Sequence, residues 1–368
     1  MVDRRRLLDD FLRLVQIDSP SFRERDVADF VREILTGLGL KVFEDQAGPR
    51  INGQAGNLYA RWPGTGEGPR ILFCTHLDTV DPGRRVKPVI RDGVVYSSGS
   101  TILGADDKAG IAAVLEALRV VRERNRPVPP LELLFTVAEE QGLVGAKHLD
   151  AGLISAGYGF VLDSDGPPGK IIVRAPSQDR IAAVVRGRAA HAGINPEDGI
   201  NAIQAAARGI APLRLGRIDG ESTANIGVIN GGIATNIVPE RVTVEGETRS
   251  LDDGKRAALT EEICRLFTGG VESAGGRVEL EVELMYPSFR LAPDHPVIQS
   301  ALRAVARVGL DPRLETTGGG SDANILNALG VPTANLACGM QKVHTTDEFI
   351  AIEDLVKSAE LVLSIIEG

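Results

Sequence analysis

The sequence contains little cysteine, and its cysteines are not arranged for a cross-link or a metal site. Only three occur among 368 residues, they lie far apart, and no two form a CxxC pair. An odd number of dispersed cysteines argues against both a disulfide framework and a cysteine zinc site. We therefore interpret Cys74, Cys264 and Cys338 as free thiols buried in the fold.

Long apolar runs are also absent. The N-terminal stretch MVDRRRLLDDFLRLVQ distributes charged residues among its leucines, so it lacks the uninterrupted hydrophobic core of a signal peptide. No segment approaches the roughly 18 to 20 consecutive apolar residues that a membrane-spanning helix requires. These absences predict a cytoplasmic protein without a membrane partner.

Acidic residues outnumber basic ones, and aromatic side chains are scarce. Lysine and arginine number 41 against 50 aspartates and glutamates, which gives a net charge of -9, and aromatics make up only 4%. Net negative charge disfavours binding to nucleic acid or anionic membranes. The few aromatics offer no platform for stacking bases. We expect no nucleic-acid partner, and we interpret the basic cluster Arg4–Arg6 as the solvated face of a helix.

The chain is long for one hydrophobic core, and its pattern changes part-way along. Up to about Arg174, segments of helical periodicity alternate with apolar strands. Beyond it, the order strand-helix-strand-strand-helix-strand is typical of a ferredoxin-like α/β sandwich. We predict an α/β fold in which residues 1–174 and 287–368 form a catalytic domain with a mixed central sheet and flanking helices. A smaller domain, residues 175–286, would be inserted into it.

Three apolar strands of the first part are each followed by polar residues that could bind a ligand. Ligands gather at the carboxyl ends of strands in open α/β sheets, so polar groups there carry more weight than elsewhere. The residues in question are His76 and Asp78, the pair Glu139–Glu140, and Asp163.

Each of these groups also has an ordinary structural interpretation. The HxD pair alone is weak evidence of a metal site. Asp106 and Asp107 begin a long helix, where the helix dipole favours carboxylates even without a metal. Glu139–Glu140 carries more weight, because adjacent carboxylates after an apolar strand repel each other unless a cation or a proton relieves them. With Asp163 and His344, the set offers the ligand types that borderline divalent metals accept.

Eight ordered segments make the chain resemble a known family over essentially its whole length. They are CTHLDTV at 74–80, LGADDKAG at 103–110, AEEQGLVGAKHL at 138–149, the strand-end Asp163, GRAAHAG at 187–193, TNIVPE at 235–240, GGGSDA at 318–323 and VHTTDEFI at 343–350. In these segments the chain resembles the co-catalytic di-metal aminopeptidase and deacylase family that includes peptidase T, acetylornithine deacetylase and succinyl-diaminopimelate desuccinylase.

The resemblance implies two divalent metal ions per chain. Zinc is the expected metal, with manganese or cobalt as alternatives, because histidine and carboxylate sites accept all three. One carboxylate would bridge both ions, and two further residues would complete each site. Carried over by position, the bridging residue is Asp106, the ligands of one ion are His76 and Asp163, and those of the other are Glu140 and His344.

The resemblance also implies roles for two neighbouring carboxylates. Asp78 would stand behind His76 as its partner, and Glu139 would be the general base that deprotonates a metal-bridging water and hands the proton to the leaving amine. In the family, the peptide bond after the bridging aspartate is cis. We therefore expect a cis bond between Asp106 and Asp107.

In similar enzymes the inserted domain forms a homodimer and contributes to the site. His191 matches a histidine that reaches the substrate of the partner subunit, where it would help to stabilise the oxyanion. Further positions match residues that anchor the substrate. These are Asn236, Arg249, Gly319 and Ser321.

Within the family, LGADDKAG and HTTDEFI look most similar to peptidase T. This implies hydrolysis of an amide bond in short peptides from the N-terminal side. An N-acyl-amino-acid deacylase or a carboxypeptidase would use the same metals and the same base, and both remain alternatives. A non-catalytic binding homologue is disfavoured, because every expected metal ligand and Glu139 are present.

Overall fold

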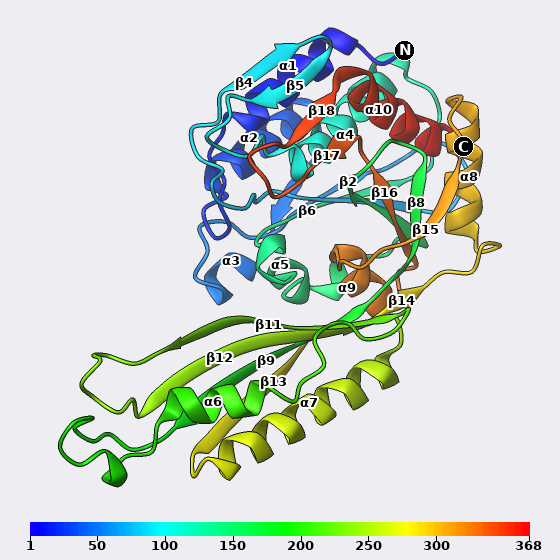
Figure 1. Ribbon diagram of the computed structural model, residues 1–368. Helices are drawn as coiled ribbons and strands as arrows, with labels where there is room; N and C mark the ends of the chain where they lie inside the picture. Colours follow the sequence, from blue (N-terminus) through cyan, green and yellow to red (C-terminus); the bar gives the residue numbers. More distant parts are fainter. The chain divides into compact units, whose positions relative to one another are not determined.

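The computed structural model describes residues 1–368, which divide into two compact units (Figure 1). Unit 1 comprises residues 1–174, 290–317 and 321–368, so it is discontinuous in sequence. Unit 2 comprises residues 175–289 together with the glycines 318–320.

Unit 1 is built on a nine-stranded mixed sheet. Its strands are β1 (Val42–Glu44), β2 (Leu58–Trp62), β3 (Ile71–His76), β6 (Leu131–Thr136), β7 (Tyr158–Ser164), β8 (Lys170–Ala175), β14 (Phe289–Arg290), β15 (Arg313–Thr316) and β16 (Thr333–Ala337). Their order is β1-β2-β6-β3-β7-β16-β8-β14, with β15 paired to β8. The centre is parallel, since β3 pairs in parallel with β6 and β7, and β7 with β16. Antiparallel pairs, β2 with β6 and β16 with β8, flank it.

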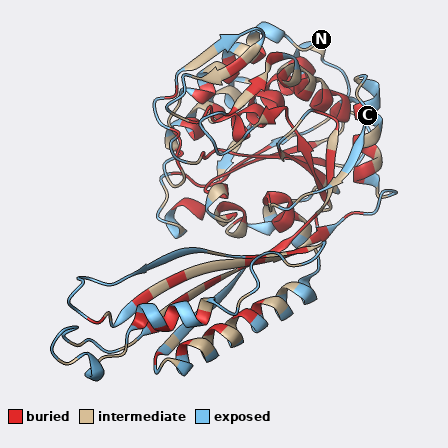
Figure 2. Ribbon diagram, viewed as in Figure 1, coloured by how far each residue is buried: buried red, intermediate tan, exposed pale blue.

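Helices pack around this sheet and complete the core of unit 1. They are α1 (Arg4–Val15), α2 (Arg25–Gly37), α3 (Ala47–Arg50), α4 (Ala105–Arg124), α5 (Val144–Lys147), α8 (Pro296–Arg307), α9 (Asp322–Ala328) and α10 (Ile352–Glu367). Helix α4 is buried on nearly all sides, and most of its buried side chains are apolar, as expected for a helix enclosed by other elements. It contacts α1, α10 and β3, and Figure 2 shows buried residues along the central strands and these helices. None of the helices combines the length and apolar character needed to cross a bilayer.

A small second sheet in unit 1 joins two distant parts of the chain. Its strands are β4 (Pro88–Arg91), β5 (Val94–Ser97), β17 (Met340–Gln341) and β18 (Phe349–Ala351). The order is β17-β18-β5-β4, so the hairpin at Asp92–Gly93 pairs with the segment that follows β16. This sheet holds both ends of the loop that carries His344.

Unit 2 is an antiparallel sheet with two helices. Its elements are β9 (Ser177–Arg186), α6 (Ala202–Ile210), β10 (Gly216–Arg217), β11 (Ser222–Gly231), β12 (Arg241–Ser250), α7 (Asp253–Ser273) and β13 (Arg277–Tyr286). The strand order is β10-β11-β12-β9-β13, and both helices lie on one face (Figure 1). Apolar residues of that face, including Val185, Val244 and Phe267, form its core. The predicted fold class, a mixed central sheet with flanking helices and a ferredoxin-like sandwich, is confirmed.

The prediction of a solvated basic helix face is wrong for Arg6. Its Nε lies 2.7 Å from Oε2 of Glu116, a buried carboxylate on α4, and it also pairs with Glu123. The backbone N–H of Asp3 donates to the same Glu116 at 2.8 Å. A carboxylate can be buried there because a cation and a backbone donor compensate its lost hydration. The sequence gives no sign of this pairing, since the partners lie in different helices.

All three cysteines are free thiols, as predicted. Cys74 and Cys338 are buried in unit 1, whereas Cys264 on α7 is only partly buried. The prediction of burial is therefore wrong for Cys264, which lies at the edge of the core of unit 2.

Candidate active site

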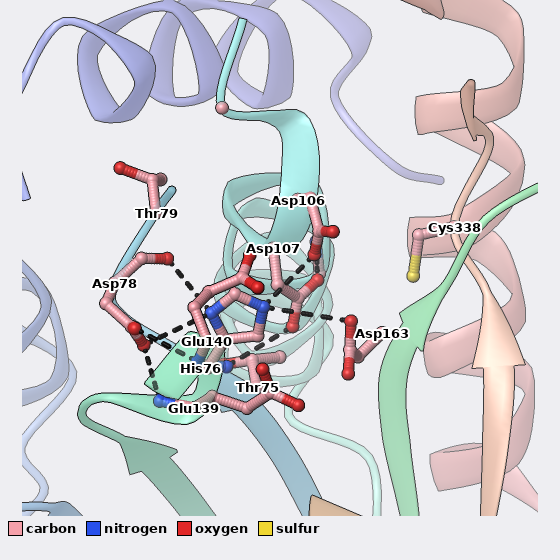
Figure 3. A network of polar contacts seen from close by, with 12 residues as sticks. Thr75, His76, Asp78, Thr79, Asp106, Asp107, Glu139, Glu140, Asp163 and Cys338 are labelled. Carbon is pink, nitrogen blue, oxygen red and sulfur yellow. Dashed lines mark hydrogen bonds and ion pairs between the residues drawn. The ribbon is translucent and has the colours of Figure 1, made fainter. Parts of the chain in front are cut away.

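Adjacent strands of unit 1 bring most of the predicted metal ligands and Glu139 together, as Figure 3 shows for His76, Asp106, Glu139, Glu140 and Asp163. Strands β6, β3 and β7 are neighbours in the sheet and run parallel, so their carboxyl ends meet at one edge. His76 ends β3, Glu139–Glu140 form a 3-10 turn just after β6, and Asp163 lies near the end of β7. Asp106 lies in the first turn of α4, and His344 follows β17.

The carboxylate of Asp106 lies between two histidines. Its Oδ1 is 3.1 Å from Nε2 of His76, and its Oδ2 is 3.2 Å from Nε2 of His344. Asp163 lies on the His76 side, with Oδ1 3.7 Å from the same Nε2. Glu140 lies on the other side, with Oε1 3.1 Å from Nε2 of His344. The five side chains therefore form two groups that share one carboxylate.

Burial and the crowding of acidic groups shift the pKa values of this cluster. Burial, together with the charge of Asp106, raises the pKa of Asp163 to about 8. Burial and the charge of Asp163 hold the pKa of Glu139 well above its usual range. Contacts with Asp106 and Glu140 raise the pKa of His344 to about 10. Carboxylates that repel one another in this way would be stabilised by a nearby positive charge.

The donor set fits divalent cations. Histidine nitrogens and carboxylate oxygens of His76, Asp106 and Glu140 lie within 4.8 Å of one another, as do those of His76, Glu139 and Asp163. The Oε1 atom of Glu140 is buried and lies 3.1 Å from Nε2 of His344, a nitrogen that would share a bound cation with it. Histidine with carboxylates is the chemistry that zinc, manganese and cobalt accept.

The backbone at the start of α4 is unusual. The peptide bond between Asp106 and Asp107 is cis, as the family resemblance implied. The carboxylate of Asp107 does not join the cluster; it accepts hydrogen bonds from the backbone N–H of His76 at 3.3 Å and of Gly110 at 3.2 Å. The first turn of α4 is thereby tied to the end of β3.

Asp78 lies behind His76 but contacts it chiefly through its backbone. Nδ1 of His76 is 2.9 Å from the carbonyl oxygen of Asp78 and 3.5 Å from the carboxylate Oδ1. The carboxylate instead accepts hydrogen bonds from the backbone N–H of Glu139 at 2.9 Å and of Glu140 at 3.2 Å. Asp78 thus connects the histidine of β3 to the acidic pair that follows β6.

Comparison with known proteins decides the family. The family model described as "Peptidase family M20/M25/M40" matches residues 72–368. The chain belongs to this peptidase family. The resemblance inferred from the sequence motifs is thereby confirmed, and the chain is an enzyme of the hydrolase class.

Solved and curated relatives of this peptidase cover nearly the same length. The crystal structure of aminopeptidase PepT from Bacillus cereus is 46% identical and covers 100% of this chain and 98% of its own, with a TM-score of 0.89. A tripeptidase from Staphylococcus aureus is 40% identical with the same coverage and a TM-score of 0.94. Peptidase T of Escherichia fergusonii is 27% identical over 353 residues, which is 85% of this chain and 86% of the relative.

Three buried carboxylates of the peptidase lie close to the cluster and were not singled out from the sequence. Glu348 accepts hydrogen bonds from the backbone N–H of Gly104 at 2.7 Å and of Asp106 at 3.1 Å. Asp322 accepts one from the hydroxyl of Thr136 at 2.5 Å, and Glu24 contacts the segment after β6. Glu348 and Asp322 lie within the motifs HTTDEFI and GGGSDA. Nothing in the sequence distinguishes such a supporting carboxylate from an ordinary acidic residue near a helix or a turn.

The remaining predicted residues of the peptidase are divided between its units. In unit 2, His191 is exposed and forms an isolated β-bridge with Ile237, next to Asn236, whose carbonyl accepts the N–H of Ala192. In unit 1, Ser321 is buried as the N-cap of α9, and its own N–H donates to Oδ1 of Asn324 at 3.1 Å.

Arg249 of unit 2 already has an acidic partner. Its Nε and Nη2 donate to the two carboxylate oxygens of Glu247 at 2.9 and 3.1 Å, and Nη1 donates to the carbonyl of Gly318 at 3.3 Å. Gly318 begins the turn that includes Gly319. The guanidinium is thus held against this turn in a defined orientation, with Nη1 directed toward it.

Proposed function

We propose that the chain hydrolyses an amide bond of short peptides with the help of two divalent metal ions, zinc being the expected metal. The observation that carries this proposal is the position of Asp106, whose two carboxylate oxygens each lie beside a different histidine. His76 and Asp163 would bind one ion and Glu140 and His344 the other. Asp106 would bridge them.

Bound at these residues, two cations would lower the pKa of an attacking water and stabilise the oxyanion that forms at the amide carbon. Glu139 would take the proton from that water and pass it to the leaving amine. Its carboxylate is buried and lies within 4.8 Å of donor atoms of His76 and Asp163, beside the proposed ions and within reach of a water held there. The backbone of Asp78 would keep Nδ1 of His76 occupied, so that Nε2 faces the cluster.

The motifs and the similarity to solved peptidases support short peptides as the substrate class. An aminopeptidase and a tripeptidase, both at least 40% identical over the whole chain, favour a free N-terminal amine on a short peptide. An N-acyl-amino-acid deacylase or a carboxypeptidase would use the same cluster, and remains the alternative. In either case, Asn236, Arg249, Gly319 and Ser321 are the proposed substrate-binding residues.

A substrate panel separates these activities. We expect a metal-loaded enzyme to cleave tripeptides with a free amine and to release their N-terminal residue. The matched substrates carry the same residues with an acetylated amine, and we expect these to be cleaved at least about tenfold more slowly, since a buried site loses roughly 1.4 kcal/mol or more with one unmatched polar contact. Liquid chromatography identifies the products. Faster cleavage of the acylated series would establish the deacylase instead.

We also propose that unit 2 mediates a homodimer in which His191 serves the site of the partner. Supporting this, side chains on the loops around His191 expose apolar surface: Ile194 is 76% exposed and Ile233 86% exposed. Exposed apolar groups of this kind are typical of an interface. His191 itself has an imidazole that accepts only a local N–H, from Gly193.

Mixing two inactive variants tests this arrangement. In a dimer of Glu139→Ala with His191→Ala, one site has both an intact Glu139 and an intact partner histidine. A randomised equal mixture should therefore regain about a quarter of wild-type activity, since half of the dimers are mixed and each has one complete site of two. Sedimentation equilibrium should give twice the mass of one chain. A dimer without recovered activity would place His191 outside the partner's site, and a monomer would exclude the dimer.

A further inference from the structure

The backbone that carries Glu139 is held by two buried carboxylates. Three consecutive N–H groups, those of Ala138, Glu139 and Glu140, donate to side-chain oxygens rather than to backbone carbonyls. Ala138 donates to Oε1 of Glu24 at 3.0 Å, and the other two donate to Asp78 at 2.9 and 3.2 Å. The orientation of this segment is therefore set by side chains from elsewhere in unit 1.

Glu24 belongs to an N-terminal segment that lies before the residues matched by the family model, 72–368. This segment, residues 19–24, runs beside the end of β3. The carbonyl of Ser19 accepts the N–H of Thr79 at 2.9 Å, and the hydroxyl of Ser21 donates to Oδ2 of Asp78 at 2.7 Å. One short segment thus supplies one of the two carboxylates, Glu24, and contacts the other, Asp78.

The environment of Glu24 indicates a specific role. Its side chain is fully buried, Oε1 accepts from Phe22 at 2.7 Å and from Ala138, and Oε2 has no hydrogen-bond partner. A buried carboxylate without a cation is costly, so its presence calls for an explanation. Ala138 has a φ of 50°, a left-handed conformation that alanine rarely adopts. The hydrogen bond that the N–H of Ala138 donates to Glu24 holds the residue that directs the chain into Glu139.

We propose that Glu24 is a positioning residue for the reaction, which fixes the backbone at Ala138 so that the side chain of Glu139 faces the reacting atoms. This inference rests on the proposed role of Glu139 as general base. A general base must lie within hydrogen-bonding distance of the proton that it accepts. A displacement of about 1 Å can cost on the order of a hundredfold in rate.

Two substitutions separate the hydrogen bond from the charge. Glu24→Ala removes the acceptor and leaves the N–H of Ala138 unpaired, so we expect kcat for a tripeptide to fall about 10- to 100-fold. KM should stay within about threefold, because the substrate contacts are unchanged. Glu24→Gln keeps an amide oxygen for both N–H groups and removes the repulsion from Asp78. We expect its kcat to lie within about fivefold of the wild type. Glu33→Ala, an exposed acid on α2, is the control.

Bound metal per chain and the thermal midpoint are measured on every variant, beside Glu139→Ala. A purely structural role would lower the midpoint of Glu24→Ala and leave kcat of the folded enzyme at the wild-type value, and this result would overturn the inference. So would a loss of metal that parallels the loss of activity. If Glu139→Ala keeps full activity, the proposed function itself fails, whatever Glu24 does.

Ser21→Ala decides the matter if Glu24→Ala does not fold. This substitution removes the hydroxyl that donates to Asp78, the other carboxylate that holds the backbone of Glu139 and Glu140. Ser21 is only partly buried. We expect kcat to fall about 3- to 10-fold with metal content unchanged. A wild-type kcat for Ser21→Ala would contradict the positioning role of this segment.

Discussion

Replacing Glu139 with alanine is expected to lower kcat by about a thousandfold while two metal ions stay bound to each chain. General-base catalysis contributes roughly 10²- to 10⁴-fold, and no other carboxylate in the cluster is free to replace this one. Asp106, Glu140 and Asp163 are the proposed ligands, and Asp78 accepts backbone N–H groups. Turnover of a tripeptide and elemental analysis of the purified variant are the measurements.

The metal analysis is the more discriminating half of this experiment. Glu139, His76 and Asp163 also have donor atoms within 4.8 Å of one another, so Glu139 lies within reach of an ion. If the variant lost about one ion per chain together with its activity, Glu139 would be a ligand rather than the base. Glu67→Ala, which removes an exposed acid of unit 1, serves as the matched control and should behave as the wild type.

Replacing Asp106 with alanine is expected to abolish binding of both metal ions and, with it, activity. Each oxygen of this carboxylate lies 3.1 or 3.2 Å from a different histidine, so one substitution removes a donor from both proposed sites. We expect close to two divalent ions per wild-type chain. A chelator should remove them and abolish activity, and added metal should restore it. For Asp106→Ala, added metal should restore nothing.

His344→Ala provides the graded comparison. This histidine faces only one side of the cluster, with Nε2 near Asp106 and Glu140. Its loss should leave about one ion per chain, because His76, Asp106 and Asp163 remain on the other side. Two tightly bound ions in Asp106→Ala, or no ion in the wild type under metal-replete conditions, would exclude the bridging arrangement.

The parts of the fold that could be predicted from the sequence are those with long, regular patterns. Apolar runs predicted β3, β6 and β7, and the carboxyl ends of these strands predicted where polar side chains gather. The residues at which these strands end were harder to predict from the sequence. The mostly apolar run LELLFTVA continues to Ala138, but β6 ends at Thr136, because the N–H of Val137 donates to Oδ1 of Asn57 and Ala138 turns left-handed.

What could not be predicted is how buried carboxylates support the cluster. Glu24, Asp322 and Glu348 each contact a partner more than a hundred residues away in sequence. At the level of sequence, such residues are indistinguishable from acids near helix ends or in turns. The pairing of β5 with β18 has the same cause, since strands of three or four residues carry little periodicity and their pairing depends on tertiary contacts. The cis bond after Asp106 was predictable only through the family resemblance.

Because unit 1 is discontinuous in sequence, it cannot complete its fold until unit 2 has been synthesised. Domains emerge from the ribosome in sequence and fold as units. Strands β3, β6 and β7, with His76, Asp106 and Asp163 on them or beside them, are synthesised before unit 2. Strand β16 and the loop of His344 are synthesised only after all of β9 to β13. A nascent chain thus carries most of an acidic cluster with one histidine missing. Hydrolysis by this peptidase would begin only after unit 2 has been synthesised.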